Sequence, residues 1–242
     1  MGVVDEGELR GQLAAAFRWT ARFGWNEAVA NHFSAAVSDD GAQFLLNPVG
    51  RHFSRMTASE LVLLDAFGER PSNADPTAWV LHAQLHRLVP RARVALHTHM
   101  PYATALACLD GYELQMIDQN ACRFYGRVAY DRDYGGALLA DSEGARLAAL
   151  LGDDHSVVML GNHGVLVIGE TVADAFDEMY YLEHACRVQV LALSTGRSLS
   201  VLSDEVARRT RGHWRDYPGD IAGQHLSELM AILDSEEPSY RD

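Results

Sequence analysis

The sequence predicts one globular α/β domain. Two observations carry this prediction: the chain has 242 residues, 48% of them hydrophobic, and its apolar residues alternate between helical spacing and short strand-like runs. A chain of this length can bury a sizeable core, and mixed elements pack as layers around a sheet. No repeat, low-complexity segment or linker interrupts the pattern. We therefore assign residues 1–242 to a single domain, with 200–242 as a C-terminal helical extension.

The first elements follow from apolar spacing and from the residues that begin or end them. Residues 7–24 place apolar side chains at helical spacing and predict a helix that stops at its closing glycine. Residues 32–46 predict two short strands around the turn sequence SDDG. Thr57 and Glu60 have the spacing of a helix-capping box, and an apolar strand is expected over 61–67.

The rest of the chain alternates in the same way. Proline at the first position of PYATALACL favours a helix start, and Thr171 is placed to cap a long helix. We expect helices over 77–89, 101–109, 141–151, 171–195 and 225–240, and strands over 92–99, 155–160 and 165–169.

The charge of the chain limits its partners. The formal net charge is -13, which repels phosphate backbones and anionic lipid surfaces. We therefore expect neither nucleic acid nor a membrane as a partner, but a small-molecule substrate. An anionic substrate stays possible, because a bound metal supplies local positive charge.

Cysteine usage and the N-terminus favour a cytoplasmic protein. The cysteines, Cys108, Cys122 and Cys186, are scattered and form no CxxC pair, which is typical of a reducing compartment. The acidic N-terminus lacks the apolar core of a secretion signal, and no run of about 18 apolar residues predicts a membrane span.

Two histidine motifs predict a metal site. In His97-Thr98-His99, at the end of a predicted strand, the two imidazoles are two residues apart and so point to the same face. His163 lies in the turn Gly161-Asn162-His163-Gly164, whose glycines allow positive φ angles and close backbone approach. Either motif alone also fits ordinary packing or turn formation. Together they give three histidines with an open fourth position, which is the arrangement of catalytic zinc.

With these motifs the chain resembles the class II aldolase/adducin family. The matching segments are ANHFSAAV (30–37), FLLNPVGRHFSRMTASELVLLD (44–65), VALHTHMPYATALA (94–107) and GNHGVLVIGETVADAFDEMYYLEHACRVQVLAL (161–193). The resemblance implies a three-layer αβα sandwich around a mainly antiparallel sheet. It implies Zn²⁺, or another divalent ion such as Mn²⁺, on His97, His99 and His163. It also implies a homotetramer with sites near subunit interfaces.

The departures from the family pattern concern its catalytic residues. In the sugar-phosphate aldolases a glutamate after a serine pair moves the proton, and here Ala78 stands at that position. Pro76 and Thr77 replace the serines, and Gln119 replaces a tyrosine supplied by a neighbouring subunit. A standard ketose-phosphate aldolase is therefore not expected. The segment PSNADPTAWVLHAQLHR resembles the adducin-like branch more closely.

The resemblance also proposes further site residues. Asn31, Ser34, Arg51 and Thr77 are candidates for binding the substrate, and His32, Tyr125 and Gln119 are candidates for the catalytic set. Each has an ordinary structural alternative, such as a turn-forming Asn, a hydrogen-bonded His or a solvated Arg. We interpret His82 and His86, one helical turn apart, as packing or surface residues.

The sequence thus predicts a metal-dependent, lyase-like enzyme of the aldolase or decarboxylase type. It would break a C–C bond in a small hydroxy, keto or carboxylated substrate through a metal-stabilised enediolate. One alternative is a non-catalytic, adducin-like binding scaffold with a vestigial metal site. Another is a sugar-phosphate aldolase or epimerase with displaced catalytic residues.

Overall fold

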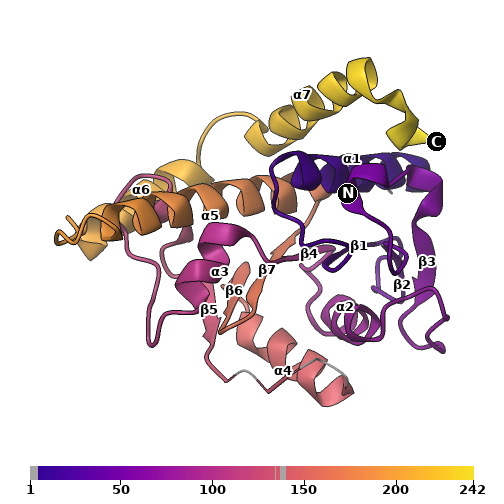
Figure 1. The fold of residues 1–242 in the computed structure, drawn as a ribbon, viewed down its shortest axis with the longest axis horizontal. Coiled ribbons are helices and arrows are strands. Elements are labelled where there is room, and N and C mark those ends of the chain that lie inside the picture. Colours follow the sequence, from indigo (N-terminus) through magenta and orange to yellow (C-terminus); the bar gives the residue numbers. More distant parts are fainter. Residues whose placement is uncertain (1–4, 134, 137–139) are drawn as a thin grey trace.

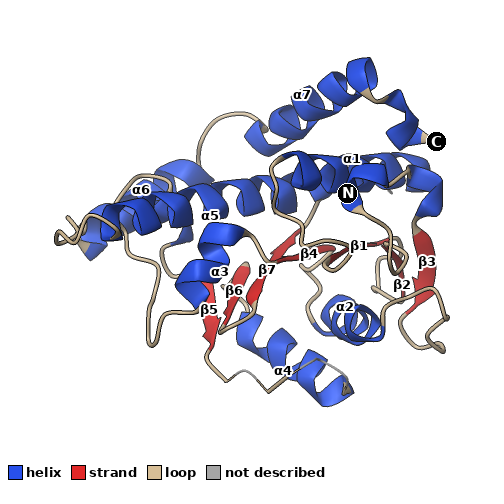
Figure 2. Cartoon of the chain, viewed as in Figure 1, coloured by secondary structure: helices blue, strands red, loops and turns tan. Residues whose placement is uncertain are grey.

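The computed structural model describes residues 5–133, 135–136 and 140–242. A seven-stranded sheet with the order β3-β2-β1-β4-β7-β6-β5 forms the centre, and every pairing is antiparallel except that of β5 with β6. Helices cover both faces of this sheet (Figures 1 and 2). The predicted three-layer αβα arrangement around a mainly antiparallel sheet is confirmed.

The bounds of the elements agree with the predicted ranges to within a few residues, apart from two elements discussed below. The strands are β1 His32–Ala36, β2 Gln43–Leu46, β3 Val62–Asp65, β4 Val94–Thr98, β5 Val128–Asp131, β6 Val157–Leu160 and β7 Gly164–Gly169. The helices are α1 Glu6–Arg22, α2 Pro76–Leu88, α3 Pro101–Ala107, α4 Asp141–Leu151, α5 Val172–Leu193, α6 Asp204–Arg215 and α7 Ile221–Glu236. The predicted capping box of Thr57 and Glu60 is present, on a single 3₁₀ turn, Ala58–Glu60.

Two elements, β5 and α6, were missing from the sequence-based prediction. Strand β5 has four residues at the edge of the sheet and buries one of them, the small Ala129, so it shows neither an apolar run nor a period of two. Helix α6 buries one residue, Ala207, and its other apolar side chains, Val206 and Trp214, are too few to mark a continuous apolar stripe in the sequence. Its N-terminus is capped by the Ser203 hydroxyl, which accepts a hydrogen bond from the Val206 N–H.

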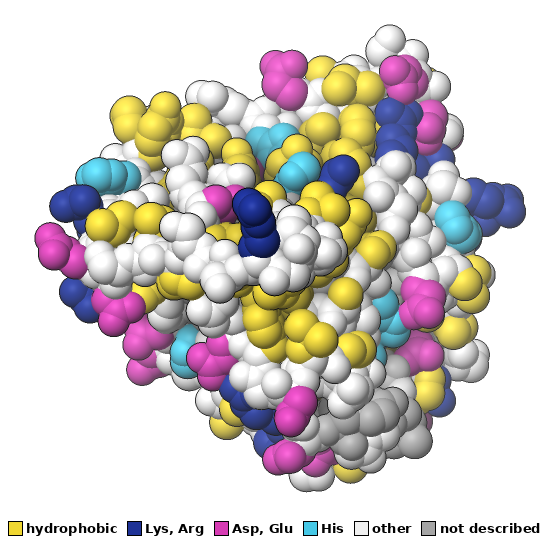
Figure 3. All heavy atoms as spheres, turned by 60° about the vertical axis from the view of Figure 1, so that its left-hand side comes forward, with side chains coloured by type: hydrophobic (Ala, Val, Ile, Leu, Met, Phe, Trp, Pro, Cys, Tyr) yellow, Lys and Arg dark blue, Asp and Glu magenta, His cyan; other side chains and the backbone are white. Residues whose placement is uncertain are grey.

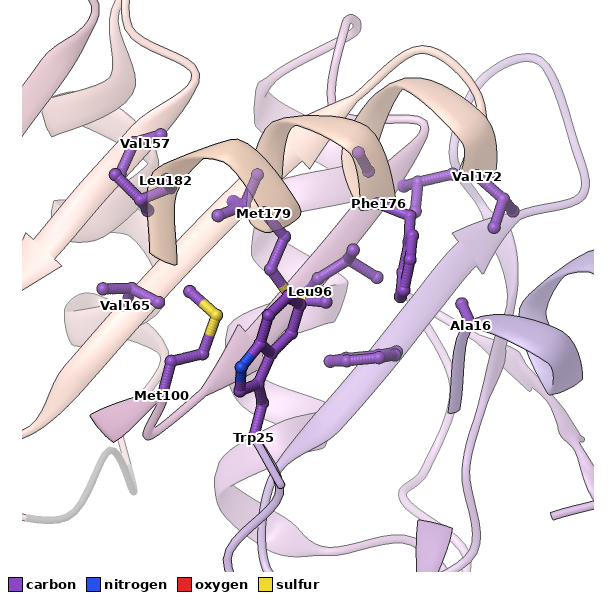
Figure 4. Close-up of a cluster of buried hydrophobic side chains, with 14 of the residues drawn as sticks. Ala16, Trp25, Leu96, Met100, Val157, Val165, Val172, Phe176, Met179 and Leu182 are labelled. Atoms are coloured by element: carbon purple, nitrogen blue, oxygen red, sulfur yellow. The ribbon is translucent and has the colours of Figure 1, made fainter. Parts of the chain in front are cut away.

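The central strands separate two hydrophobic clusters by simple alternation. On β7, Val165 and Val167 join the cluster beneath α1, α3 and α5, whereas Leu166 and Ile168 join the cluster beneath α2 and α4. Figure 4 shows Phe176, Met179 and Leu182 of α5 packed above the sheet in the first cluster. Because both faces of β4 and β7 are covered, the histidines at their ends are carried by a rigid part of the fold.

Helix α5 also fixes the chain directly after β4. The Glu183 carboxylate accepts hydrogen bonds from the backbone N–H groups of Tyr102 and Ala103, each at 2.9 Å. These groups belong to the first turn of α3, where N–H groups lack helical partners. Burial nevertheless outweighs these bonds and raises the pKa of Glu183 to about 7.

The surface carries mixed charge. Figure 3 shows acidic and basic side chains interspersed around a more apolar middle on one face. Within the described ranges, none of the helices combines the length and the apolar character that crossing a bilayer requires.

The raised pKa of Glu183 predicts a pH-dependent stability. Between pH 4.5 and about 7 the folded protein binds more protons at this site than the unfolded chain, so the free energy of unfolding falls as pH rises through this window. At about 1.36 kcal/mol per pKa unit, the contribution lost is roughly 3 kcal/mol. Urea unfolding of Glu183→Gln should lack this component, while a control at the exposed Glu228, Glu228→Gln, should keep it. If the free energy of unfolding changed with pH in the same way in the wild-type protein and in Glu183→Gln, the assignment would be contradicted.

Candidate metal centre

Three imidazoles converge where β4 ends. His97 and His99 project from the same side of the chain, and their Nε2 atoms lie 3.2 Å apart. The ring centroid of His163 lies 4.8 Å from that of each of them. One ring nitrogen from each histidine falls within 4.8 Å of the others, and within the described ranges no fourth His, Cys, Asp or Glu joins this group. The three predicted ligands therefore lie close enough together to share one ion, and their role as metal ligands stays a prediction.

The outer nitrogens of two of these rings are already engaged. His97 Nδ1 donates a hydrogen bond to the Val165 carbonyl at 2.9 Å, and His99 Nδ1 donates to the Glu27 carboxylate. Each ring therefore turns an Nε2 lone pair toward the other, an arrangement that is repulsive unless a cation or a shared proton lies between them. A metal-binding histidine is commonly oriented by such a bond from its other nitrogen. These residues fit a divalent metal.

Burial favours the neutral form, which binds metal, in two of these imidazoles. It lowers the pKa of His97 well below its usual range, and the neighbouring histidines lower it further. The pKa of His163 is also lowered, mainly by burial. Neutral imidazoles are the ligands that divalent metals require.

The turn that carries His163 differs in one respect from the prediction. The positive φ, 55°, belongs to Asn162 and not to either glycine. The glycines are needed for space: a Cβ on Gly161 would lie 2.8 Å from the Asp131 carbonyl oxygen, and one on Gly164 would lie 2.8 Å from the His99 ring. Close approach, and not backbone conformation, explains the two glycines.

A cavity of about 200 Å³ opens beside the three histidines. Its polar lining comes from Asn31 before β1, His32 on β1, Asn47 after β2, and Asp75 and Thr77 at the start of α2, together with the metal-ligand candidates. Asn31 is buried with φ of 73°, and its Nδ2 has no hydrogen-bond partner among the described residues. The cavity thus combines an imidazole cluster with several polar groups that converge on it.

Comparison with known proteins identifies the family. Residues 11–190 match the family described as Class II Aldolase and Adducin N-terminal domain. The chain belongs to the class II aldolase/adducin family. A class 2 aldolase homologue of Caulobacter vibrioides is 34% identical over 100% of this chain and 95% of its own length. Rat alpha-adducin is 33% identical over 96% of this chain but only 34% of its own length.

Solved structures agree with this membership. An aldolase II superfamily protein from Pseudomonas syringae has a TM-score of 0.89 and 34% identity, covering 99% of this chain and 97% of that chain. L-fuculose 1-phosphate aldolase from Glaciozyma antarctica PI12 has a TM-score of 0.82 and 26% identity, covering 98% of this chain and 93% of that chain.

At the start of α2, Ala78 stands at the position where the sugar-phosphate aldolases of this family carry their glutamate. Ala78 is buried and lines the cavity. The carboxylate nearest to it in sequence is that of Asp75, the N-cap of α2, which accepts hydrogen bonds from the Thr77 and Ala78 N–H groups. The Thr77 hydroxyl also donates to Asp75, at 2.6 Å. Thr77 therefore lies at the cavity, as predicted, but its hydroxyl proton is used within the cap.

Four other predicted site residues do not line the cavity of their own chain. Ser34 is fully buried behind it, and Arg51 forms an ion pair with Glu60. Tyr125 and Gln119 lie beside α6, where their carbonyl groups accept hydrogen bonds from Arg211 and Trp214. A role for Tyr125 or Gln119 in a neighbouring subunit's site stays a prediction.

The sequence did not reveal which residues form hydrogen bonds with the predicted site residues. Glu27, which holds His99, lies in an irregular segment 72 residues away in the chain. His82 and His86 are not surface residues: both are buried, and hydrogen bonds link them to Ser34 and, through His82, to His32. His82 and His86 are one helical turn apart, and His32 and Ser34 are two residues apart on a strand. This pair of spacings was the sequence feature that could have predicted the contact.

We expect Gly164→Ala to damage the metal centre. The added Cβ would lie 2.5 Å from the Thr98 carbonyl oxygen and 2.8 Å from the His99 ring, so β4 or the imidazole must shift. Overpacking of this kind costs about 1–3 kcal/mol, and zinc affinity should fall with it. Gly212→Ala, on α6 with open space around it, is the control and should be neutral or stabilising. Equal zinc affinity in the two variants would contradict the steric argument.

Glu27→Gln tests the orientation of His99. Loss of the charged acceptor should lower zinc affinity roughly 10- to 100-fold, as is usual for groups that orient a ligand. Competition with a chromophoric chelator measures this affinity directly. The exposed Glu69, which follows the turn after β3, provides the matched control Glu69→Gln. Unchanged affinity in Glu27→Gln would show that the carboxylate does not support the site.

Proposed function

We propose that the protein is a metal-dependent carbon–carbon lyase that acts on a small hydroxy, keto or carboxylated substrate. The observation that carries this proposal is the convergence of His97, His99 and His163 on one side of a cavity that several polar side chains also line. A catalytic metal needs this open arrangement, whereas a structural metal is enclosed by protein ligands. Zinc is the proposed metal, with manganese or another divalent ion as alternatives.

The metal, when bound, would stabilise the negative charge that develops on a substrate oxygen. The remaining tasks fall to the chain itself. A base removes the hydroxyl proton, the O–H electron pair becomes a new carbonyl, and the adjacent C–C bond breaks with its electrons passing to the neighbouring carbonyl group. A proton then returns to carbon. Asn31 donates to a substrate oxygen through its unpaired Nδ2.

His32 is the proposed proton carrier among the described residues of the cavity. It lines the cavity, and its ring centroid lies 4.7 Å from that of His97. Burial lowers the pKa of His32 to about 4, even though Asp75 acts to raise it. A neutral imidazole at this position can accept a proton. Tyr125, which lies elsewhere in the protomer, and metal-bound water are the other choices.

The other functional hypotheses make different demands on the cavity. Arginine and lysine are absent from its described lining, which favours an uncharged or singly charged substrate over a sugar phosphate. The similarity to alpha-adducin favours the binding scaffold as the second candidate. A scaffold needs neither metal nor turnover. The homotetramer with sites near its interfaces and the cytoplasmic location stay predictions.

Metal removal separates the enzyme from the scaffold. We expect the purified protein to carry about one divalent ion per chain by elemental analysis, and a screen of hydroxy- and keto-acids to reveal a cleaved substrate. Chelation should abolish that activity, and Zn²⁺ or Mn²⁺ should restore it. His32→Gln should lower kcat roughly 100-fold or more without loss of metal, whereas a control at the exposed His213, His213→Gln, should behave as wild type. Full activity in the metal-stripped protein would contradict the proposal of a metal-dependent lyase.

A further inference from the structure

A buried line of hydrogen bonds runs from the cavity into the protein between β1 and α2. His32 Nδ1 lies 2.7 Å from His82 Nε2, and His82 Nδ1 lies 2.5 Å from the Ser34 hydroxyl. The same hydroxyl lies 2.7 Å from His86 Nε2, and His86 Nδ1 lies 2.7 Å from the Ala92 carbonyl oxygen. His82, Ser34 and His86 are at most 3% exposed. No step of the proposed reaction uses these three residues.

The secondary structure explains how the line forms. His32 and Ser34 are two residues apart on β1, so both face α2, while Phe33 and Ala35 face the opposite cluster. His82 and His86 are four residues apart on α2 and face the sheet together. The two elements therefore interlock four polar side chains within an otherwise apolar layer.

The last acceptor sets the direction of every bond. A carbonyl oxygen only accepts, so His86 Nδ1 must carry the proton, and a neutral His86 then has an unprotonated Nε2. The single hydroxyl proton of Ser34 is donated to that atom. Ser34 must therefore accept from His82 Nδ1–H, which leaves His82 Nε2 to accept from His32 Nδ1–H.

The direction of these bonds requires the imidazoles of His82 and His86 to be neutral, and their surroundings favour this form. Burial lowers the pKa of His86 to about 4 and that of His82 well below its usual range. Among the residues that the structure describes, no carboxylate accepts a hydrogen bond from His82 or His86, and an unpaired charge in such a place would be costly. The Ala92 carbonyl cannot take up a proton either, so the line orients its members and does not conduct protons away.

We infer that Ser34, His82 and His86 are positioning residues that hold His32 with an unprotonated Nε2, and that this atom accepts a hydrogen bond from a hydroxyl group of the ligand. This inference rests on the proposed function and names the substrate class more narrowly. The ligand presents an O–H to His32 beside the metal centre. A carboxylate or phosphate oxygen at that place would face a lone pair and be rejected.

The tautomer of His32 is the direct test. Two-bond ¹H–¹⁵N correlation spectra of the histidine-labelled protein, metal-free and zinc-loaded, should show His32, His82 and His86 each protonated on Nδ1 alone. In Ser34→Ala, His82 loses its acceptor, so its proton should move to Nε2 and His32 should become protonated on Nε2. Ser34→Thr keeps the hydroxyl and should restore the wild-type pattern. Thr20→Ala removes a buried hydroxyl bonded to Ala16, away from the cavity, and should leave His32 unchanged.

A pair of small probes tests the ligand class. The zinc-loaded protein should bind glycolate, which carries a hydroxyl group, about tenfold more tightly than acetate, since one hydrogen bond contributes about 1.4 kcal/mol. Ser34→Ala should remove this preference, and Thr20→Ala should keep it. The ratio of the glycolate and acetate affinities does not depend on a general loss of stability, because such a loss would affect both affinities alike.

Several outcomes would overturn the inference. These are a wild-type His32 protonated on Nε2, a His32 tautomer that is unchanged in Ser34→Ala, or a glycolate preference that survives in that variant. A zinc-induced shift of His32 Nε2 as large as those of the three ligands would make it a fourth ligand instead. Because the wild-type spectrum needs no variant and no turnover, failure of the lyase proposal leaves this test intact.

Discussion

The antiparallel register of β4 is the constraint on which the rest of the site depends. β4 lies between β1 and β7, and this pairing places His32 opposite His97 and His97 opposite Leu166. Two residues after the end of β4 the chain enters α3, whose first N–H groups donate to the buried Glu183 of α5. A shift of β4 by one residue against its neighbours would turn His97 and His99 to the other face of the sheet, into the cluster beneath α5. Packing far from the cavity therefore determines which atoms face the metal.

The same register explains what the sequence could and could not predict. His97, His99 and His163 were predictable because local spacing and a two-glycine turn mark them, and the family resemblance joins the two motifs. Glu27 was not, because its bond to His99 spans 72 residues and follows from the path of an irregular segment. The sequence does not predict helix α6 because its apolar residues are few, or β5 because Ala129 is the one residue that this short strand buries.

The departures from the aldolase pattern lie next to the features that compensate for them. Where the sugar-phosphate aldolases place a glutamate, α2 has the buried Ala78, and one turn farther along the same helix stands His82. That histidine contacts His32 across the gap to β1. Asp75 keeps a carboxylate at the start of the helix, but it serves as the N-cap, so the proposed proton carrier is His32 on the facing strand. In the proposed mechanism a neutral imidazole would take the role of that carboxylate, which would suit a substrate whose proton the bound metal acidifies.

The histidine line also costs stability, which argues for its functional role. Each buried imidazole loses hydration, and a core of apolar side chains with the same volume would be easier to form. Both nitrogens of His82, both nitrogens of His86 and the Ser34 hydroxyl are nevertheless paired, so the fold specifies the network. The one nitrogen that these bonds leave over belongs to His32, which lines the cavity. A buried polar network whose one unpaired nitrogen belongs to a residue of the cavity is best explained by a use of that nitrogen at the site, as we infer for His32.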